Sequence, residues 1–192
     1  MIRLGDVAAV RSGLVLGRKQ TKQETAFKYK LLNLRSIQGN GEIDMNQIES
    51  IHMVEELNPV YLTHAGDLVV RLTPPYVAVL IDESTEGLVI PSSFAVIRTN
   101  YKDVLPGYLC WLLNTQKVQQ KIFDNTTNSI YAAVKPSYFS EFEFDLLPIE
   151  QQRLIAELNA LARNETRLLR ELADQKDRYY SCLIGKVQNE LK

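Results

Sequence analysis

The sequence predicts an α+β protein, with a globular domain of mixed strands and helices over residues 1–148 and one long helix over residues 149–192. Three observations carry this prediction. Short β-rich runs separated by turn residues fill the first part of the chain. After Pro148 no further proline occurs, and leucines recur at alternating steps of four and three residues. With 192 residues, 45% of them hydrophobic, the chain can build one ordinary core and a projecting helix.

The elements of the first part follow from local patterns. β-branched and aromatic residues at alternating positions predict strands, Gly and Asn cluster in a turn, and a proline followed by apolar residues at helical spacing predicts a helix. In chain order we expect a strand over 27–34, a turn over 38–41, strands over 67–72, 76–81 and 93–98, a helix from Pro106 to about Asp124, and a strand with one apolar face over 141–146.

The second part carries a heptad pattern that we call the leucine seam. Residues at this spacing lie on one stripe of a helix, and a helix of about 60 Å, at 1.5 Å per residue, is too long for a small domain to cover. A second helix must therefore pack on it, and a homodimer is expected. The seam consists of Leu154, Leu158, Leu161, Glu165, Leu168, Leu172, Gln175, Tyr179 and Cys182, and Ile155, Ala162 and Leu169 widen it by a neighbouring row.

Two members of the seam are polar. Glu165 and Gln175 interrupt the apolar pattern. Polar residues in such positions can set the register of a coiled coil at a cost in stability. The other interpretation is that both are exposed where two helices splay apart, and the sequence alone leaves both open.

The net charge of −1 hides an uneven distribution. Residues 1–40 sum to +6 and residues 41–110 to −7. A polyanion responds to the local field, because charges beyond roughly 8–10 Å are screened. The basic loop that contains Arg18, Lys19 and Lys22 is therefore a candidate for phosphate contacts, and a solvated loop is the alternative.

The sequence contains no catalytic centre that the known motifs would support. Thr73-Pro74-Pro75-Tyr76 differs at one position from the Asn/Asp/Ser-Pro-Pro-Tyr signature of amino-methyltransferases. However, no glycine-rich turn between a strand and a helix precedes it to hold an adenosyl cofactor, so a stiff turn is the expected role. His52 and His64 lack neighbours at the spacing of metal ligands. We expect no metal and a binding role.

Targeting and redox signals are equally sparse. No apolar run approaches the roughly 20 residues that cross a bilayer, and the N-terminus lacks the apolar stretch of a signal peptide. We therefore expect a cytoplasmic protein without membrane contact. Cys110 and Cys182 are too few for a disulfide framework, and buried or half-buried thiols are expected.

Four segments follow one another along the chain: Ile2–Gly13, Gly66–Val70, Pro106–Asn114 and Phe144–Ile155. Together they resemble one known family, the DNA-specificity subunit of type I restriction–modification systems. The last of them matches the family's hydrophobic-Pro-x-x-x-Gln-x-x-Ile junction into a conserved helix. Family members usually carry two recognition domains and two helices, so the resemblance implies a half-length subunit with a target recognition domain over 1–148 and one conserved helix over 149–192.

The resemblance implies sequence-specific binding of double-stranded DNA and phage defence by DNA methylation and restriction. The partners it implies are a separate adenine methyltransferase, which alone would hold S-adenosylmethionine, and a restriction or translocase subunit. The chain itself would be non-catalytic and need no cofactor. The expected DNA-binding residues are Arg18, Lys19, Lys22, Arg71, Asn128, Tyr131 and Lys135, and the expected dimer residues are Leu154, Leu158, Leu161, Leu168, Leu172 and Tyr179.

Two other functions stay open at this point. The first is a recognition module of the same fold in another methyltransferase or phage-defence complex. The second is a coiled-coil adaptor that binds protein and no DNA, which the acidic middle of the chain favours.

Overall fold

The structure, a computed structural model, describes residues 1–126 and 133–191. It contains strands in three sheets, five α-helices and four short 3-10 turns among the described residues. The strands are β1 (Ile2–Arg3), β2 (Ala8–Ser12), β3 (Gln20–Thr21), β4 (Lys28–Leu31), β5 (Glu49–Met53), β6 (Leu68–Arg71), β7 (Ala78–Leu80), β8 (Leu88–Val89), β9 (Phe94–Thr99) and β10 (Glu143–Phe144). The helices are α1 (Leu4–Val7), α2 (Pro106–Leu113), α3 (Gln116–Asp124), α4 (Pro136–Glu141) and α5 (Ile149–Glu190), with 3-10 turns η1 (Gly17–Lys19), η2 (Met45–Gln47), η3 (Pro59–Tyr61) and η4 (Glu83–Thr85).

An antiparallel sheet in the order β2-β9-β6-β7 forms the centre of the domain. Successive side chains of a strand point to opposite faces, so β6 and β9 bury both of their faces. Val70 and Ile97 belong to a core shared with α2, α3 and α4, whereas Val69 and Val96 belong to a second core on the other face. The continuous apolar run of β6 follows from this two-sided burial.

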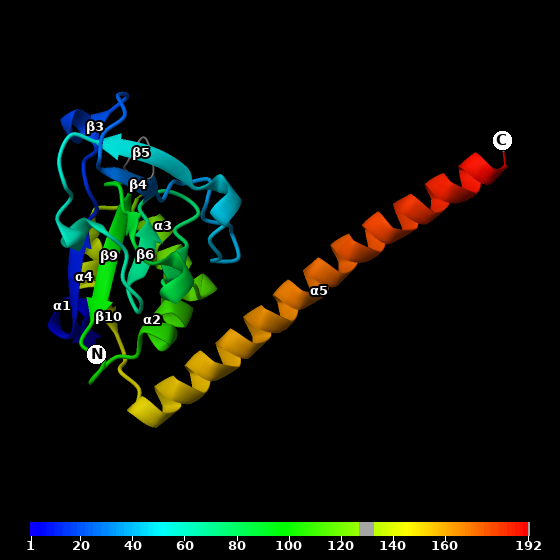
Figure 1. Cartoon of the computed structure of the whole chain (residues 1–192). Coiled ribbons are helices and arrows are strands. Elements are labelled where there is room, and N and C mark those ends of the chain that lie inside the picture. The colour runs from blue at the N-terminus through cyan, green and yellow to red at the C-terminus, as the bar shows by residue number, and fades with distance from the viewer. Residues whose placement is uncertain (127–132, 192) are drawn as a thin grey trace.

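A smaller sheet in the order β3-β5-β4-β8 covers one end of the domain, where β4 and β8 pair in parallel. Its inner face carries Leu31, Ile51 and Met53, which are buried in a third core. In Figure 1 this sheet lies at the top of the domain, and the N-terminus and the start of α5 lie at the bottom. The short β1–β10 pair joins the two ends of the domain's chain.

Most of the predicted elements are confirmed, with three corrections. The helix expected from Pro106 to Asp124 is two helices, because Asn114 ends α2 with its Nδ2 donating to Cys110 O at 2.9 Å and a new helix starts at Gln116. The strand expected over 141–146 is shorter in the structure and consists of β10 alone. Glu141 belongs to α4, and β1 has only two residues with which β10 can pair. The α4 helix was not predicted, and neither were α1 and the strands β1, β2, β3, β5 and β8.

The helix α5, which we call the arm, projects from the domain (Figure 1). Only its first turns contact the domain closely. Ala156 packs against Gly107 of α2, where an added Cβ would lie 3.1 Å from the Ala156 Cβ. Further along, Arg163 donates to Gly41 O at 2.6 Å. The predicted long helix is confirmed, and no described helix is long and apolar enough to cross a membrane.

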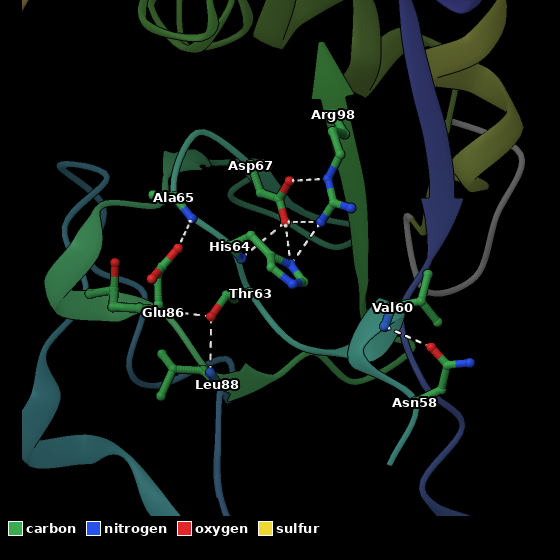
Figure 2. A network of polar contacts seen from close by, with 10 residues as sticks. Asn58, Val60, Thr63, His64, Ala65, Asp67, Glu86, Leu88 and Arg98 are labelled. Carbon is green, nitrogen blue, oxygen red and sulfur yellow. Dashed lines mark hydrogen bonds and ion pairs between the residues drawn. The ribbon is translucent and has the colours of Figure 1, made fainter. Parts of the chain in front are cut away.

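A buried carboxylate holds the turn before β6. Asp67 is 1% exposed and forms a two-pronged ion pair with Arg98 of β9, at 2.6 and 2.7 Å (Figure 2). Its Oδ2 also accepts from the backbone N of His64. Gly66 has φ +87°, and a Cβ there would collide with the Tyr101 hydroxyl. The Gly-Asp pair therefore supplies a turn that only glycine fits and an anchor to the neighbouring strand.

Candidate nucleic-acid interface and helical arm

The outer face of the small sheet is polar and basic. Lys28 and Lys30 alternate along β4 with residues of the inner face, and both are exposed. The strand register sets Lys28 opposite His52 and Lys30 opposite Ser50, and His52 also pairs with Thr21 of β3. Two ammonium groups thus share one face with Thr, Ser and His side chains that can form hydrogen bonds, a composition that suits contacts to a phosphate backbone.

Lys19 and Lys22 lie at the edge of the same sheet. Lys19 ends η1 and its Nζ is 3.0 Å from a carboxylate oxygen of Glu55, with both side chains largely exposed. Such an exposed pair is weak and can exchange for a phosphate contact. Lys22 is exposed directly after β3. Arg18 has its backbone in η1, and its side chain is outside the described part of the structure.

Arg71 braces the double-proline turn. Its Nη2 donates to Pro74 O at 3.1 Å and its Nη1 to Leu34 O at 3.5 Å. Burial lowers the pKa of Arg71, although a guanidinium remains charged at neutral pH. The side chain therefore joins the end of β6 to the segment that follows β4. Any base contact by Arg71 would come from a guanidinium already oriented by two carbonyls.

Lys135 lies at the same end of β6. Val134 N donates to Leu72 O at 2.8 Å, which fixes the segment just before α4 beside the residue that follows Arg71. Lys135 is exposed at the N-cap of α4. The structure thus brings Arg71 and Lys135 to one end of the central sheet. Among the described hydrogen bonds, none joins this pair to Lys19 or Lys22. Asn128 and Tyr131 lie outside the described residues.

The candidate catalytic motif is built as a turn. Tyr76 is 3% exposed, and its hydroxyl lies 3.0 Å from the hydroxyl of Thr126. Its ring is thus buried among core residues, where it cannot stack on a base. The described residues contain no group of three or more His, Cys, Asp or Glu side chains arranged to hold a metal ion.

The sequence analysis did not predict two lysines of the interface as site residues. Lys28 and Lys30 contributed only to the charge count. Their spacing of two within a strand is the signal that sets both on one face.

The exposure of the two thiols differs from the expectation. Cys110 is buried, but Cys182 is exposed on the arm, because the seam that contains it faces solvent in the single chain.

The arm has two distinct faces. The residues that meet the domain are Gln152, Ala156 and Arg163, which lie within about 40° of one another at 100° per residue. At the same 100° per residue, the leucine seam lies about 180° around the helix axis from these three residues. Its apolar members Leu154, Leu158, Leu161, Leu168, Leu172 and Tyr179 are 49% to 66% exposed. In the neighbouring row, Ile155 packs on the domain while Ala162 and Leu169 are exposed.

No family model and no curated protein matches the chain by sequence. Solved structures do match it. A chain of a type I restriction–modification system, studied for complex assembly and conformational transition, is 21% identical with a TM-score of 0.66, over 91% of this chain and 45% of that one. The HsdS subunit of Thermoanaerobacter tengcongensis is 19% identical with a TM-score of 0.62, over 89% and 43%. The S subunit of the M. genitalium type I system is 11% identical with a TM-score of 0.51, over 86% and 40%.

The chain therefore spans less than half the length of the structures that it matches. Its domain and arm together have the fold of part of a type I specificity subunit. The resemblance that the sequence predicts is confirmed at the level of the fold.

Proposed function

We propose that this chain recognises a specific sequence in double-stranded DNA as a specificity subunit of a type I restriction–modification complex. The observation that carries the proposal is the shared fold: a recognition-type domain and a projecting helix match S subunits over about 90% of the chain. At such low identity the likeness is one of fold, and DNA binding rests additionally on the basic outer face of the small sheet.

In this proposal the contacts divide into two groups. Lysines of the small sheet and its edge, Lys19, Lys22, Lys28 and Lys30, meet phosphates and position the domain. Arg71 and Lys135, at one end of the central sheet, read base edges, because donors directed at both N7 and O6 of guanine distinguish it from the other bases in the major groove. Sequence choice then depends on the second group and overall affinity on the first.

The arm serves assembly. Its leucine seam leaves a row of large apolar side chains in water, which a second helix would cover. We assign this role to a second copy of the chain, and a second specificity chain is the other source of a helix. A separate adenine methyltransferase, which carries S-adenosylmethionine, and a restriction subunit would bind the assembled protein. The chain itself is non-catalytic in this account and acts in the cytoplasm.

Two identical domains related by a twofold axis read two identical half-sites in inverted orientation. An arm of about 60 Å, at 1.5 Å per residue, spans more than one turn of duplex, which is roughly 34–36 Å. The target would therefore be bipartite, with two short half-sites separated by a spacer of fixed length.

Selection from a random duplex library by the purified chain, at several salt concentrations, tests the DNA-binding part. The proposal expects enrichment of one bipartite inverted repeat. Binding without enrichment would leave a nonspecific DNA-binding module, and absence of binding, with or without added methyltransferase, would favour the protein adaptor. Co-purified subunits distinguish a type I complex from another methyltransferase complex.

A further inference from the structure

Two polar residues interrupt the leucine seam of the arm. Within the seam, Glu165 and Gln175 stand among leucines, tyrosine and cysteine, and both are exposed in the single chain. We propose that two copies of the arm pair antiparallel in the one register that sets Glu165 opposite Gln175 of the second copy, and that these two residues act as the register determinant. The inference rests on the proposed self-assembly and on the antiparallel orientation that the resemblance implies, and it goes beyond them by fixing the alignment of the two arms.

A parallel pair would place like residues opposite each other. Glu165 would then face Glu165 of the second copy in the middle of the interface. Two carboxylates removed from water without a partner repel each other, and the unpaired charge costs several kcal/mol in a low-dielectric interface. Leu158, Leu161 and Leu168 would gain from pairing in either orientation, so the acidic layer decides against the parallel form.

Antiparallel pairing gives Glu165 a hydrogen-bond donor. Along the seam, the steps of four end at Leu158, Glu165, Leu172 and Tyr179, and the steps of three end at Leu161, Leu168, Gln175 and Cys182. In an antiparallel coiled coil, residues of the first set face residues of the second set. When Glu165 faces Gln175, the carboxylate can accept a hydrogen bond from the amide, and the twofold axis repeats this layer on the other side. The same register stacks Leu168 on Leu172, Leu161 on Tyr179 and Leu158 on Cys182 of the second copy.

The next antiparallel register, displaced by one heptad, loses this match. Glu165 would face Leu168 and Gln175 would face Leu158 of the second copy. Each dimer would then bury four polar side chains against leucine, without a partner for any of them. The proposed register pairs all four and keeps the central leucines together.

The neighbouring row of the arm fits the same alignment. Leu169 comes close to Leu169 of the second copy beside the twofold axis, and extends the apolar contact. On the opposite flank, Glu171 comes near its own counterpart. Arg167 compensates for this charge, because its Nη1 lies 2.6 Å from a Glu171 carboxylate oxygen within each arm. The domain lies on the far side of the arm and leaves the seam accessible.

The exposed Cys182 makes the register measurable by disulfide formation in the full-length chain. Leu158→Cys sets a thiol opposite Cys182 of the second copy in the proposed register. Gln151→Cys does so only in the register displaced by one heptad, and the unmodified chain does so only in a parallel pair. A disulfide needs Cα atoms within about 7 Å, and residues 158 and 182 of one arm are about 36 Å apart, so no bond forms within a chain.

We expect the Leu158→Cys chain to give a covalent dimer on non-reducing gels after mild oxidation, and the other two chains to stay monomeric there. A dimer linked through Gln151→Cys, or through Cys182 of the unmodified chain, overturns the register while leaving self-assembly intact. A monomer in light scattering at micromolar concentration, without any cross-link, overturns both. Selection of DNA by that monomer would still support DNA recognition.

A swap of the two polar residues tests the cause. Gln175→Glu alone faces Glu165 with a second carboxylate twice per dimer and should weaken dimerisation roughly tenfold or more. Adding Glu165→Gln to it restores one amide and one carboxylate in each layer, and should recover most of the affinity. Sedimentation equilibrium gives both constants. A double variant as weak as Gln175→Glu alone would refute the role of this layer.

Discussion

Gln152 of the arm is hydrogen-bonded to Leu105, the residue that precedes α2. The Gln152 Oε1 accepts from Leu105 N at 2.9 Å, and its Nε2 donates to Asp103 O and Leu147 O, both at 2.8 Å. The side chain is fully buried. One amide thus links the start of the arm, the loop before α2 and the segment after β10, and it gives a physical reason for the Gln of the Pro-x-x-x-Gln junction.

Replacing Gln152 by Leu should loosen the junction of arm and domain. Three backbone groups lose their partner at a site without access to water, and each such loss costs about 1–3 kcal/mol when water cannot enter. Urea denaturation followed by fluorescence of Trp111 should show a lower free energy of unfolding. The exposed neighbour Gln151→Leu serves as control. Equal stability of both variants would remove Gln152 from this role.

Replacing Asp67 by Asn should destabilise the domain. Arg98 would lose its two-pronged ionic partner, and one of the two amide hydrogens of Asn would point at its guanidinium. We expect a loss of about 1–3 kcal/mol, the usual contribution of hydrogen bonds to charged groups, by thermal denaturation. Glu150→Gln, which removes the exposed pair with Arg153, is the matched control and should change stability by less than about 1 kcal/mol. A similar small effect for both would show that the ion pair of Asp67 with Arg98 adds nothing.

The two cysteines should react at different rates. Burial raises the pKa of the Cys110 thiol, with the nearby Arg163 acting in the opposite sense, so Cys110 stays protonated over a wider pH range. Only the thiolate is nucleophilic. At pH 8, and at a protein concentration low enough to keep the arms unpaired, a thiol reagent should therefore modify Cys182 quickly and Cys110 only after denaturation. Rapid reaction of two thiols in the native protein would contradict the buried position of Cys110.

The fold was predictable wherever a pattern repeats. Strands β6 and β9 and the arm follow from local apolar runs and from a heptad that continues for several turns. The break at Asn114 depends on hydrogen bonds to Cys110 and to Ala78 on the neighbouring β7, a tertiary contact that helical spacing does not contain. Likewise α4 is short and gains its stability from Phe139, which is buried in the core.

The site was predictable in part. Charge counting located the basic segment, but only the register of β4 against β5 sets Lys28 and Lys30 on one outer face. Arg71 was expected to contact DNA, and the sequence does not show that the fold gives its guanidinium two backbone carbonyls. The proximity of Lys135 to the end of β6 follows from the backbone hydrogen bond of Val134 to Leu72 and from the burial of both side chains in one core, contacts between segments about sixty residues apart that no local pattern encodes.

The proposed division of contacts predicts two kinds of DNA-binding variant. Lys28→Ala and Lys30→Ala, like Lys19→Ala and Lys22→Ala, should weaken binding to all sequences and reduce the salt dependence by about one counterion per lost contact. Lys135→Ala and Arg71→Ala should instead relax base choice, by about 1–3 kcal/mol per lost contact. Lys102→Ala, in the loop beside the start of the arm, is the control. Fluorescence anisotropy on target and scrambled duplexes measures both effects, and six variants with the same behaviour would refute the division.

We expect this chain to direct methylation to a bipartite target. Sequencing that detects methylated adenine, in host cells with and without the gene, measures this directly. We expect one inverted-repeat motif with a fixed spacer, methylated on both strands only when the gene is present. An unchanged methylome would contradict the specificity role, and an asymmetric bipartite motif that depends on this chain alone would contradict the symmetric dimer.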